Sequence, residues 1–478
     1  MAQETRQSAG VSTSQRGTVT VDPAKLVPVL KELRKFLNPY LPLFGRTEAR
    51  DNAGIVVRGL LSDLPRKTIE PIAARYKVKR RPLQRFVGAG PWNDNAILDQ
   101  LNKEVGTELG RGDAALIVDS SGFAKKGDDS VGVQRQWCGR LGKVENCQVG
   151  VYLSYASAEG HTLVDQMLYL PESWAKDKAR REKCYVPEDV VFKKGWEQAD
   201  DMVASRAAQL PHGWVLGDDA FGRVTEFRDR LGDRDERYML DVPRNTRVKT
   251  LGQKPGRGRA SAARAAWRWA KQLPQKRWGL FTVRDGTKGP LQVWAAWTRV
   301  LTQRNPKDKK SPWDREEILL VLKTVEATSR TKYCLSNSAE GTTEPELVRA
   351  ASTRWNVEDC LERAKGEVGM AQYEVRSWTG WRHHMTLALL ALWFLVRQHR
   401  RLQGAFPPLH GSTGALLRGG IPPRSRPRRS RVSASDQRNA HPQRTVAPSS
   451  LGSRRTPQRC DRDRVGMTQC GMGTQVAQ

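Results

Sequence analysis

The stretch Ala114-Ala-Leu-Ile-Val-Asp-Ser-Ser-Gly122 decides the fold class of this chain. Its first five residues are apolar and predict a short buried strand, and the following acid, serines and glycine predict the turn that ends the strand. Asp119 is therefore expected at a strand end, where its carboxylate can face a ligand. The alternative for this motif taken alone is a turn-forming Asp that caps its own backbone.

The same pattern recurs in Trp214-Val-Leu-Gly-Asp-Asp-Ala-Phe-Gly222, where an apolar strand runs into acids and a glycine. If the two strands are neighbours in one sheet, Asp119 and Asp218 converge. An Asx-type cap on the next helix is the alternative for Asp218. Asp219 stands beside it, and strand alternation would send only one of the two side chains into a shared site.

The segments around these two strands indicate a mixed α/β sheet. Further strands are predicted at 130–138, 148–153 and 237–242, and helices at 197–210 and 224–231. Between 245 and 342 the pattern becomes β-rich, with predicted strands at 280–284, 291–297, 317–322 and 332–335. We expect residues 113–244 to form the first part of a core and residues 245–342 to form an inserted unit.

The N-terminal part is predicted to be helical. After a polar lead at 1–21, expected to be flexible, Asp22-Pro23 has the form of an N-cap followed by proline in the first turn, and further helices are predicted at 47–62, 67–76, 81–86 and 93–109. Arg80 and Arg81 lie in a basic cluster of this unit. We expect residues 22–112 to form a DNA-binding domain, although solvated charge is the commoner meaning of one such cluster.

The third carboxylate is sought on a helix that begins near Pro345 and runs to about residue 368, in Arg354-Trp-Asn-Val-Glu-Asp-Cys-Leu-Glu-Arg-Ala-Lys365. Arg354, Glu358, Glu362 and Lys365 share one helical stripe at this spacing. The alternative is a surface row of ion pairs, each worth about 0.3 kcal/mol. A second helix is predicted at 379–401, so residues 343–401 form a helical last part of the core.

Two strand-end Asp residues and one helical Glu are a suitable donor set for divalent metal. Mg²⁺ prefers hard oxygen ligands, and a two-metal phosphoryl-transfer centre needs carboxylates from separate elements around a phosphate. We therefore predict that Asp119, Asp218 and Glu358 are catalytic and hold two Mg²⁺ ions, with Mn²⁺ as the alternative metal. The cations expected to offset phosphate charge are Lys125, Lys126, Arg354 and Lys365.

The overall charge favours nucleic acid as the partner. The chain has 478 residues and a formal net charge of +30, from 81 Lys and Arg against 51 Asp and Glu. Its longest apolar run, 386–396, is far shorter than the roughly 20 residues that span a bilayer, and there is no secretion leader, so a cytoplasmic protein without membrane contact is expected. The seven cysteines are widely spaced and indicate neither a disulfide framework nor a zinc site.

The C-terminal stretch 402–478 has a different composition. It is rich in Pro, Ser, Gly and Arg, contains neither Lys nor Glu, and has hardly an aromatic residue. We expect a basic disordered tail. The abrupt loss of Lys and Glu has two interpretations that the sequence leaves open: a native tail, or a change of reading frame near the end of the gene.

At the acidic positions the sequence resembles the DDE transposases of bacterial insertion sequences, in the branch with a Tyr-x2-Arg-x3-Glu-x6-Lys signature. Arg354 takes the place of the signature Arg, Glu358 that of the catalytic Glu and Lys365 that of the Lys, and the segment has the Arg-Trp-x-Val-Glu form of this branch. Ala351 replaces the signature Tyr, which leaves open the contribution of that side chain. The resemblance covers roughly residues 30–400, including 215–222, 238–246 and 366–378, but not the tail.

The resemblance implies a ribonuclease-H-like catalytic core interrupted by a β-rich insertion, and metal-dependent strand cleavage and transfer. The implied partners are double-stranded DNA, as terminal inverted repeats and target, and further copies of the chain, since two DNA ends must be brought together. A bacterial cytoplasmic, nucleoid-associated protein follows. A ribonuclease-H-like endonuclease without strand transfer and a non-catalytic or domesticated DNA-binding protein remain as alternatives.

Overall fold

The computed structural model describes residues 23–251, 262–286, 289–325 and 330–403 of the chain. These residues all belong to the first of two units into which the chain divides, 1–424. The predicted flexible lead at 1–21 lies outside the described residues, and so does the predicted disordered tail except for its first two residues.

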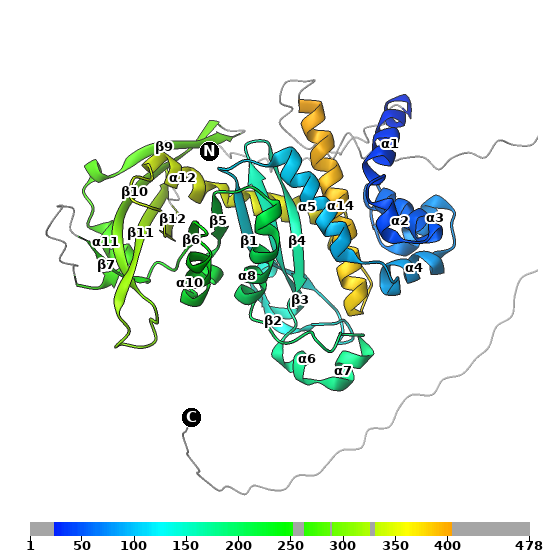
Figure 1. The fold of residues 1–478 in the computed structure, drawn as a ribbon, viewed down its shortest axis with the longest axis horizontal. Coiled ribbons are helices and arrows are strands. Elements are labelled where there is room, and N and C mark those ends of the chain that lie inside the picture. The colour runs from blue at the N-terminus through cyan, green and yellow to red at the C-terminus, as the bar shows by residue number, and fades with distance from the viewer. Residues whose placement is uncertain (1–22, 252–261, 287–288, 326–329, 404–478) are drawn as a thin grey trace, which may run out of the picture. The chain divides into compact units, whose positions relative to one another are not determined.

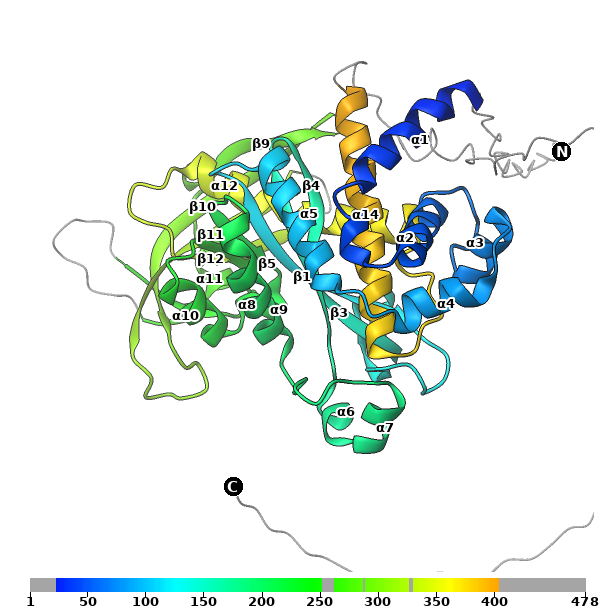
Figure 2. The same cartoon turned by 45° about the vertical axis from the view of Figure 1, so that its right-hand side comes forward.

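A mixed sheet contains the strand predicted to begin at Ala114, which is β1. β1 pairs antiparallel with β3 on one side and parallel with β5 on the other, and β5 pairs parallel with β6. β3 also pairs antiparallel with β2 and with β4, so part of the sheet has the order β4-β3-β1-β5-β6 (Figures 1 and 2). The bounds are β1 (Ala115–Ala124), β2 (Gln134–Cys138), β3 (Lys143–Ser157), β4 (Gly160–Leu168), β5 (Trp214–Gly217) and β6 (Tyr238–Asp241).

The later strands extend the same sheet. β12 pairs antiparallel with β6, and β11 and β10 follow in order, with β9 and β7 both paired to β10. The sheet is therefore continuous from the first half of the chain into residues 245–342. The bounds are β7 (Arg247–Thr250), β8 (Arg264–Ala265), β9 (Gly279–Gly286), β10 (Gly289–Gln303), β11 (Trp313–Thr324) and β12 (Thr331–Ser336).

Helices precede the sheet, connect its strands and follow it. The five before the sheet are α1 (Pro23–Leu37), α2 (Thr47–Leu60), α3 (Ile69–Tyr76), α4 (Arg80–Ala89) and α5 (Asp94–Leu109). Those between strands are α6 (Glu172–Lys176), α7 (Lys178–Lys183), α8 (Gly195–Arg206), α9 (Asp219–Gly222), α10 (Thr225–Asp233) and α11 (Ala266–Lys271). After the sheet come α12 (Glu344–Thr353), α13 (Trp355–Glu367) and α14 (Trp378–Gln403). The expected mixed α/β architecture is confirmed.

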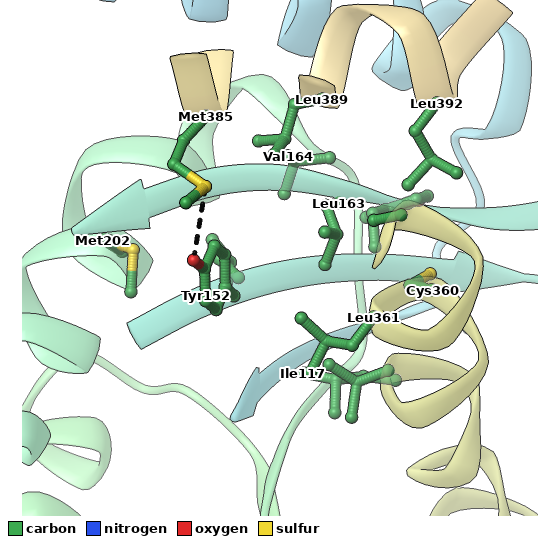
Figure 3. Packing of buried hydrophobic residues seen from close by; sticks show 14 of the residues in the cluster. Ile117, Tyr152, Leu163, Val164, Met202, Cys360, Leu361, Met385, Leu389 and Leu392 are labelled. Atoms are coloured by element: carbon green, nitrogen blue, oxygen red, sulfur yellow. Dashed lines mark hydrogen bonds between the residues drawn. The ribbon is translucent and has the colours of Figure 1, made fainter. Parts of the chain in front are cut away.

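The core lies between the sheet and the last two helices. Met385, Leu389 and Leu392 of α14 face β4, and the Tyr152 hydroxyl of β3 donates to the Met385 sulfur at 3.6 Å (Figure 3). α13 buries Val357, Cys360, Leu361 and Ala364, which recur at the three- and four-residue spacing of one helical face. This buried face fixes the rotation of α13 and leaves Glu358 exposed.

The apolar run predicted to be too short for a membrane belongs to this core. Every residue from Thr386 to Val396 is buried in α14. Among the helices that the structure describes, none has the combination of length and apolar character needed to cross a bilayer.

Two predictions about the elements were wrong, and one strand was not predicted. β1 does not end before Asp119, because residues 119–124 continue to pair with the long β3. The single helix expected from 345 to 368 is interrupted at Arg354, although neither Gly nor Pro marks the break. The strand β4 was not predicted, and it forms because β3 offers a second paired edge to it.

A buried carboxylate joins the two halves of the sheet. Glu317 of β11 is 2% exposed and accepts a hydrogen bond from the Tyr238 hydroxyl of β6 at 2.7 Å. The Arg228 side chain of α10 lies 3.3 Å from the same oxygen, and the Thr302 hydroxyl of β10 donates to the other oxygen. Side chains of β6, β10 and α10 therefore contact the Glu317 carboxylate of β11, which supplies the counter-charge for the buried Arg228 guanidinium.

We expect Glu317→Gln to lower the free energy of unfolding by about 3 kcal/mol, because it leaves the Arg228 guanidinium buried without its counter-charge. The neighbouring Glu316→Gln is the matched control. Glu316 is exposed and pairs with Arg299 at the surface, so its loss should cost about 0.5 kcal/mol. Thermal and urea unfolding of the two variants measure the difference, and equal midpoints would contradict the assignment.

Candidate functional site

Asp119 and Asp218 lie side by side at the point where two parallel strands separate. The paired register of β1 and β5 ends with Val118 opposite Gly217, and the next residue on each strand is one of the two acids. β1 itself continues, with Asp119 opposite Tyr152 of β3. The predicted convergence of the two residues follows from this register, although only Asp218 stands at a true strand end.

The two carboxylates are partly buried, and the pKa of each is raised. Burial raises the pKa of Asp119 to about 7, the nearby Asp218 carboxylate adds to the rise, and the Arg354 guanidinium opposes it. Burial is also the main cause that raises the pKa of Asp218. The backbone N–H of Ser120 donates to one oxygen of Asp119 at 2.7 Å. The backbone N–H of Ala220 donates to one oxygen of Asp218 at 3.0 Å.

Asp219 has a different environment from Asp218. Its carboxylate pairs with Arg223 one turn along, at 2.7 Å, whereas Asp218 caps α9 and acts on the charge of Asp119. Of the two adjacent acids, Asp218 is therefore the one electrostatically coupled to Asp119.

Glu358 lies near this pair but is held by an arginine. The Arg354 side chain donates to a Glu358 oxygen at 2.6 Å, and the Glu358 side chain is 60% exposed. The Glu358 charge contributes to the raised pKa of Asp119, which places the two in electrostatic reach. Within the described ranges, no three acidic, His or Cys side chains are grouped closely enough to bind a metal ion as they stand. A metal-binding group that included Glu358 would require this side chain to separate from Arg354.

Of the basic residues predicted for the site, only some lie near Asp119 and Asp218. Lys365 is brought in, because its ammonium donates to the Ser121 hydroxyl at 2.5 Å and so links α13 to β1. Lys125 instead lies over the Tyr373 ring, at 3.4 Å from its centroid, and Lys126 is exposed. Six residues of extended strand separate Asp119 from Lys125, roughly 20 Å.

Arg80 and Arg81 belong to another part of the molecule. They begin α4, which packs against α2, α3 and α14, and both are exposed. Arg80 pairs with Glu70 of α3 at 2.8 Å. If they contact DNA as predicted, they do so at a distance from Asp119 and Asp218.

Asp241 is a site residue that the sequence analysis missed. It ends β6, the next parallel strand after β5, and its carboxylate lies 3.0 Å from Arg354 and 3.1 Å from Lys332. An apolar strand running into an acid, Tyr-Met-Leu-Asp241, is the same signal that singled out Asp119 and Asp218. Asp241 anchors Arg354, and Arg354 in turn holds Glu358.

A cleft of about 990 Å³ opens beside Asp218, Asp219 and Asp241, between the end of β6 and α12 on one side and strands of residues 245–342 on the other. Ala351, at the position of the signature Tyr, is buried in its wall, and its carbonyl accepts from Lys332 at 3.0 Å. Arg284 stacks over Trp355 at 3.7 Å. The cleft is strongly basic, with a lining that includes Arg244, Lys271, Arg284, Lys323, Arg330, Lys332 and Arg354.

The donor set fits a hard divalent cation. Two adjacent, half-buried carboxylates whose charges repel each other are stabilised by a dication, and carboxylate oxygens are the ligands that Mg²⁺ and Mn²⁺ prefer. Glu358, whose charge contributes to the raised pKa of Asp119, would be a further oxygen donor.

We expect Asp119→Asn to stabilise the metal-free protein by about 1 kcal/mol, because it removes one of two repelling charges. We expect Mg²⁺ to raise the melting temperature of the unchanged protein, because an ion bound by the folded acid pair stabilises the folded state, and we expect Asp119→Asn to abolish that rise. Asp218→Asn should behave likewise, and Asp219→Asn should keep the Mg²⁺ effect. Differential scanning calorimetry with and without Mg²⁺ measures this, and loss of the effect in Asp219→Asn alone would reverse the assignment.

Comparison with known proteins places the chain in a family. A segment of 133 residues is 32% identical to a probable transposase for insertion sequence element IS701 from Microchaete diplosiphon, covering 27% of this chain and 35% of that protein. The chain thus matches about one third of the length of this curated relative. The cryo-EM structure of a piggyBac transposase synaptic complex with hairpin DNA aligns over 84% of this chain and 79% of that chain, at 11% identity and a TM-score of 0.35. A family model described as DDE superfamily endonuclease matches residues 39–290, more than half of the chain, and the protein therefore belongs to the DDE superfamily of endonucleases.

Proposed function

We propose that the protein is a transposase that cuts DNA at the ends of its element and transfers the cut strands into target DNA. The observation that carries this proposal is the register that sets Asp119 beside Asp218, with Glu358 and Arg354 on the facing helix. The name of the IS701 relative, a probable transposase, supports it. A purely endonucleolytic enzyme differs only in the joining step, which an assay of cut and joined products detects.

The strand order supports a ribonuclease-H-like core. Three antiparallel strands in the order β4-β3-β1 are followed by β5 and β6, which run parallel to β1, and helices connect β4 to β5 and β5 to β6. We propose that residues 113–244 and 343–401 form this core, and that residues 245–342 are an insertion which shares its sheet.

We propose that Asp119, Asp218 and Glu358 bind two Mg²⁺ or Mn²⁺ ions. Bound there, the ions would activate water or a 3′-hydroxyl as nucleophile and stabilise the leaving oxygen. The chain's own cations have a separate task. Lys365, fixed to Ser121 beside Asp119, and Arg354 would bind the phosphate oxygens, and the basic cleft would hold the DNA strand that leads to them.

We propose that the helical region before the sheet recognises DNA. Arg80 and Arg81 are exposed at the start of α4, where they can reach phosphates of a duplex. We propose that this region binds the terminal inverted repeats. The active form would be a dimer or larger assembly, because two ends must be held for joining, and it would work in the bacterial cytoplasm on the nucleoid.

The test is cleavage and joining of a labelled element end. In Mg²⁺ the purified protein should nick the end and join it to a target plasmid, and in Ca²⁺ it should bind without cutting. Glu358→Ala should lower the cleavage rate at least about 1,000-fold while binding persists, because it removes a metal ligand and no DNA contact. Gel analysis of cut and joined products measures both steps.

Glu362→Ala is the matched control, since Glu362 lies one turn along the same helix and is exposed. It should cut at the normal rate. Binding without cleavage by the unchanged protein would contradict the enzyme proposal. Cleavage without joined product would favour the endonuclease, and undiminished cleavage by Glu358→Ala would remove that residue from the site.

Asp241 should act as a positioning residue in this reaction. Asp241→Asn removes the charge that anchors Arg354, so we expect cleavage to slow about tenfold and half-maximal rate to need more Mg²⁺, with DNA affinity unchanged. Asp241→Glu should recover part of the rate. Mg²⁺ titrations of cleavage measure the shift, with the exposed Asp233→Asn as control; a rate loss with no change in Mg²⁺ requirement would argue against this role.

A further inference from the structure

The hairpin formed by β2 and the start of β3 presents apolar side chains to solvent. Trp137 is 63% exposed, Val144 52% and Leu141 43%. Trp137 and Val144 are cross-strand partners, and Leu141 lies in the short 3-10 turn (Gly139–Leu141) that joins the strands. No aromatic ring stacks on Trp137 within the part of the chain that the structure describes. Three large apolar side chains in eight residues form one exposed patch.

Basic residues border this patch. Arg135, Arg140 and Lys143 are exposed on the same hairpin. Lys143 pairs with Glu145 at 2.9 Å, whereas no carboxylate pairs with Arg140 among the described residues. An apolar ring surrounded by cations suits a partner that has both flat apolar surfaces and negative charge.

The hairpin curls back onto the strand that carries Asp119. Its 3-10 turn packs against β1, and the Cys138 sulfur lies so close to Gly122 that a methyl group there would meet it at 2.7 Å. The positive charge of Arg140 also reaches Lys365, where it adds to burial in lowering the lysine pKa. Lys365 in turn contacts Ser121, two residues from Asp119. The 3-10 turn of the hairpin therefore lies next to β1 and near Lys365, close to the acidic site.

We propose that this hairpin binds the DNA strand next to the cleaved phosphate, with Trp137 stacked on an unpaired base and Arg140 on a backbone phosphate. The inference rests on the proposed function for its location and adds the contact with an unstacked nucleotide. A tryptophan ring stacks on any base, whereas cations around it would repel another copy of this basic chain. Val144 and Leu141 extend the apolar floor on which the base would lie.

The first experiment compares DNA forms. Fluorescence anisotropy at fixed salt gives the affinity for single-stranded oligothymidine and for a duplex of equal length. Trp137→Ala should weaken binding of the single strand about tenfold and of the duplex less than twofold, because only the single strand offers unstacked bases. Trp137→Phe should keep most of the affinity, since it preserves a ring.

Arg140→Ala should weaken both DNA forms alike and reduce the salt dependence of binding, because it removes a phosphate contact. Tyr185→Ala is the matched control, since Tyr185 is another exposed aromatic side chain, at 76%, and should change neither affinity. Unchanged melting temperatures of all variants establish that the exposed substitutions leave the fold intact.

The second experiment locates the contact. An element end carrying 5-iodouracil beside the cleavage position is irradiated with the protein, and the crosslinked peptide is identified by mass spectrometry. We expect the peptide that contains Trp137, and we expect its loss in Trp137→Ala. Crosslinks confined to other segments would overturn the proposal.

The outcomes distinguish the two proposals. Absence of cleavage by the unchanged protein, with selective loss of single-strand binding in Trp137→Ala, would defeat the proposed function and leave the hairpin contact standing. Normal cleavage with unaltered single-strand affinity in Trp137→Ala would defeat the hairpin contact alone. A change of sedimentation in Trp137→Ala without any change in DNA affinity would show a protein interface instead and would also overturn it.

Discussion

The site depends on the point where parallel pairing between β1 and β5 stops. Where β1 and β5 are paired, their side chains are buried in the core. Val118 and Gly217 are the last paired residues of the two strands. The next residue on each strand is released from that pairing at the same level of the sheet, so two carboxylates meet without any loop having to bring them together. Their mutual repulsion is the cost of this arrangement, and the backbone framework sustains it because each strand is held by other partners.

Much of the architecture could be predicted because apolar runs mark buried strands whatever surrounds them. The helices before the sheet and the strands at 214–216 and 237–242 follow from local pattern. The local sequence pattern was insufficient where contacts with distant residues decide whether a strand or helix continues. Ser120 and Gly122 have turn-forming character, yet β3 continues past them and keeps β1 extended. The break at Arg354 likewise has no local marker, and its side chain is engaged with a carboxylate more than 100 residues earlier in the chain.

The same distinction applies to the site. Asp119 and Asp218 could be paired from sequence because strand ends of neighbouring parallel strands meet, while their role as ligands stays a prediction. Lys125 was grouped with them by proximity in sequence, and the continued strand carries it away. Asp241 was overlooked because Val-Pro follows it instead of Gly or Ser, although its strand pattern is the same. Arg354 shows what a sequence signature leaves out. Its position on a helical stripe does not reveal that Asp241, on a separate strand, pairs with it.

The pairing of β12 with β6 has a consequence for the history of the chain. A strand with an unpaired edge is a template for association with other chains, and β6 is paired on one side by β5 and on the other by β12. Removing residues 245–342 would uncover that edge in the middle of the molecule and leave Arg228 without its buried counter-charge. Residues 245–342 are therefore part of the structural framework of the sheet and could not be removed without other changes. A shorter ancestor or descendant without it would need another way to cover β6, such as a helix or loop laid along the same edge.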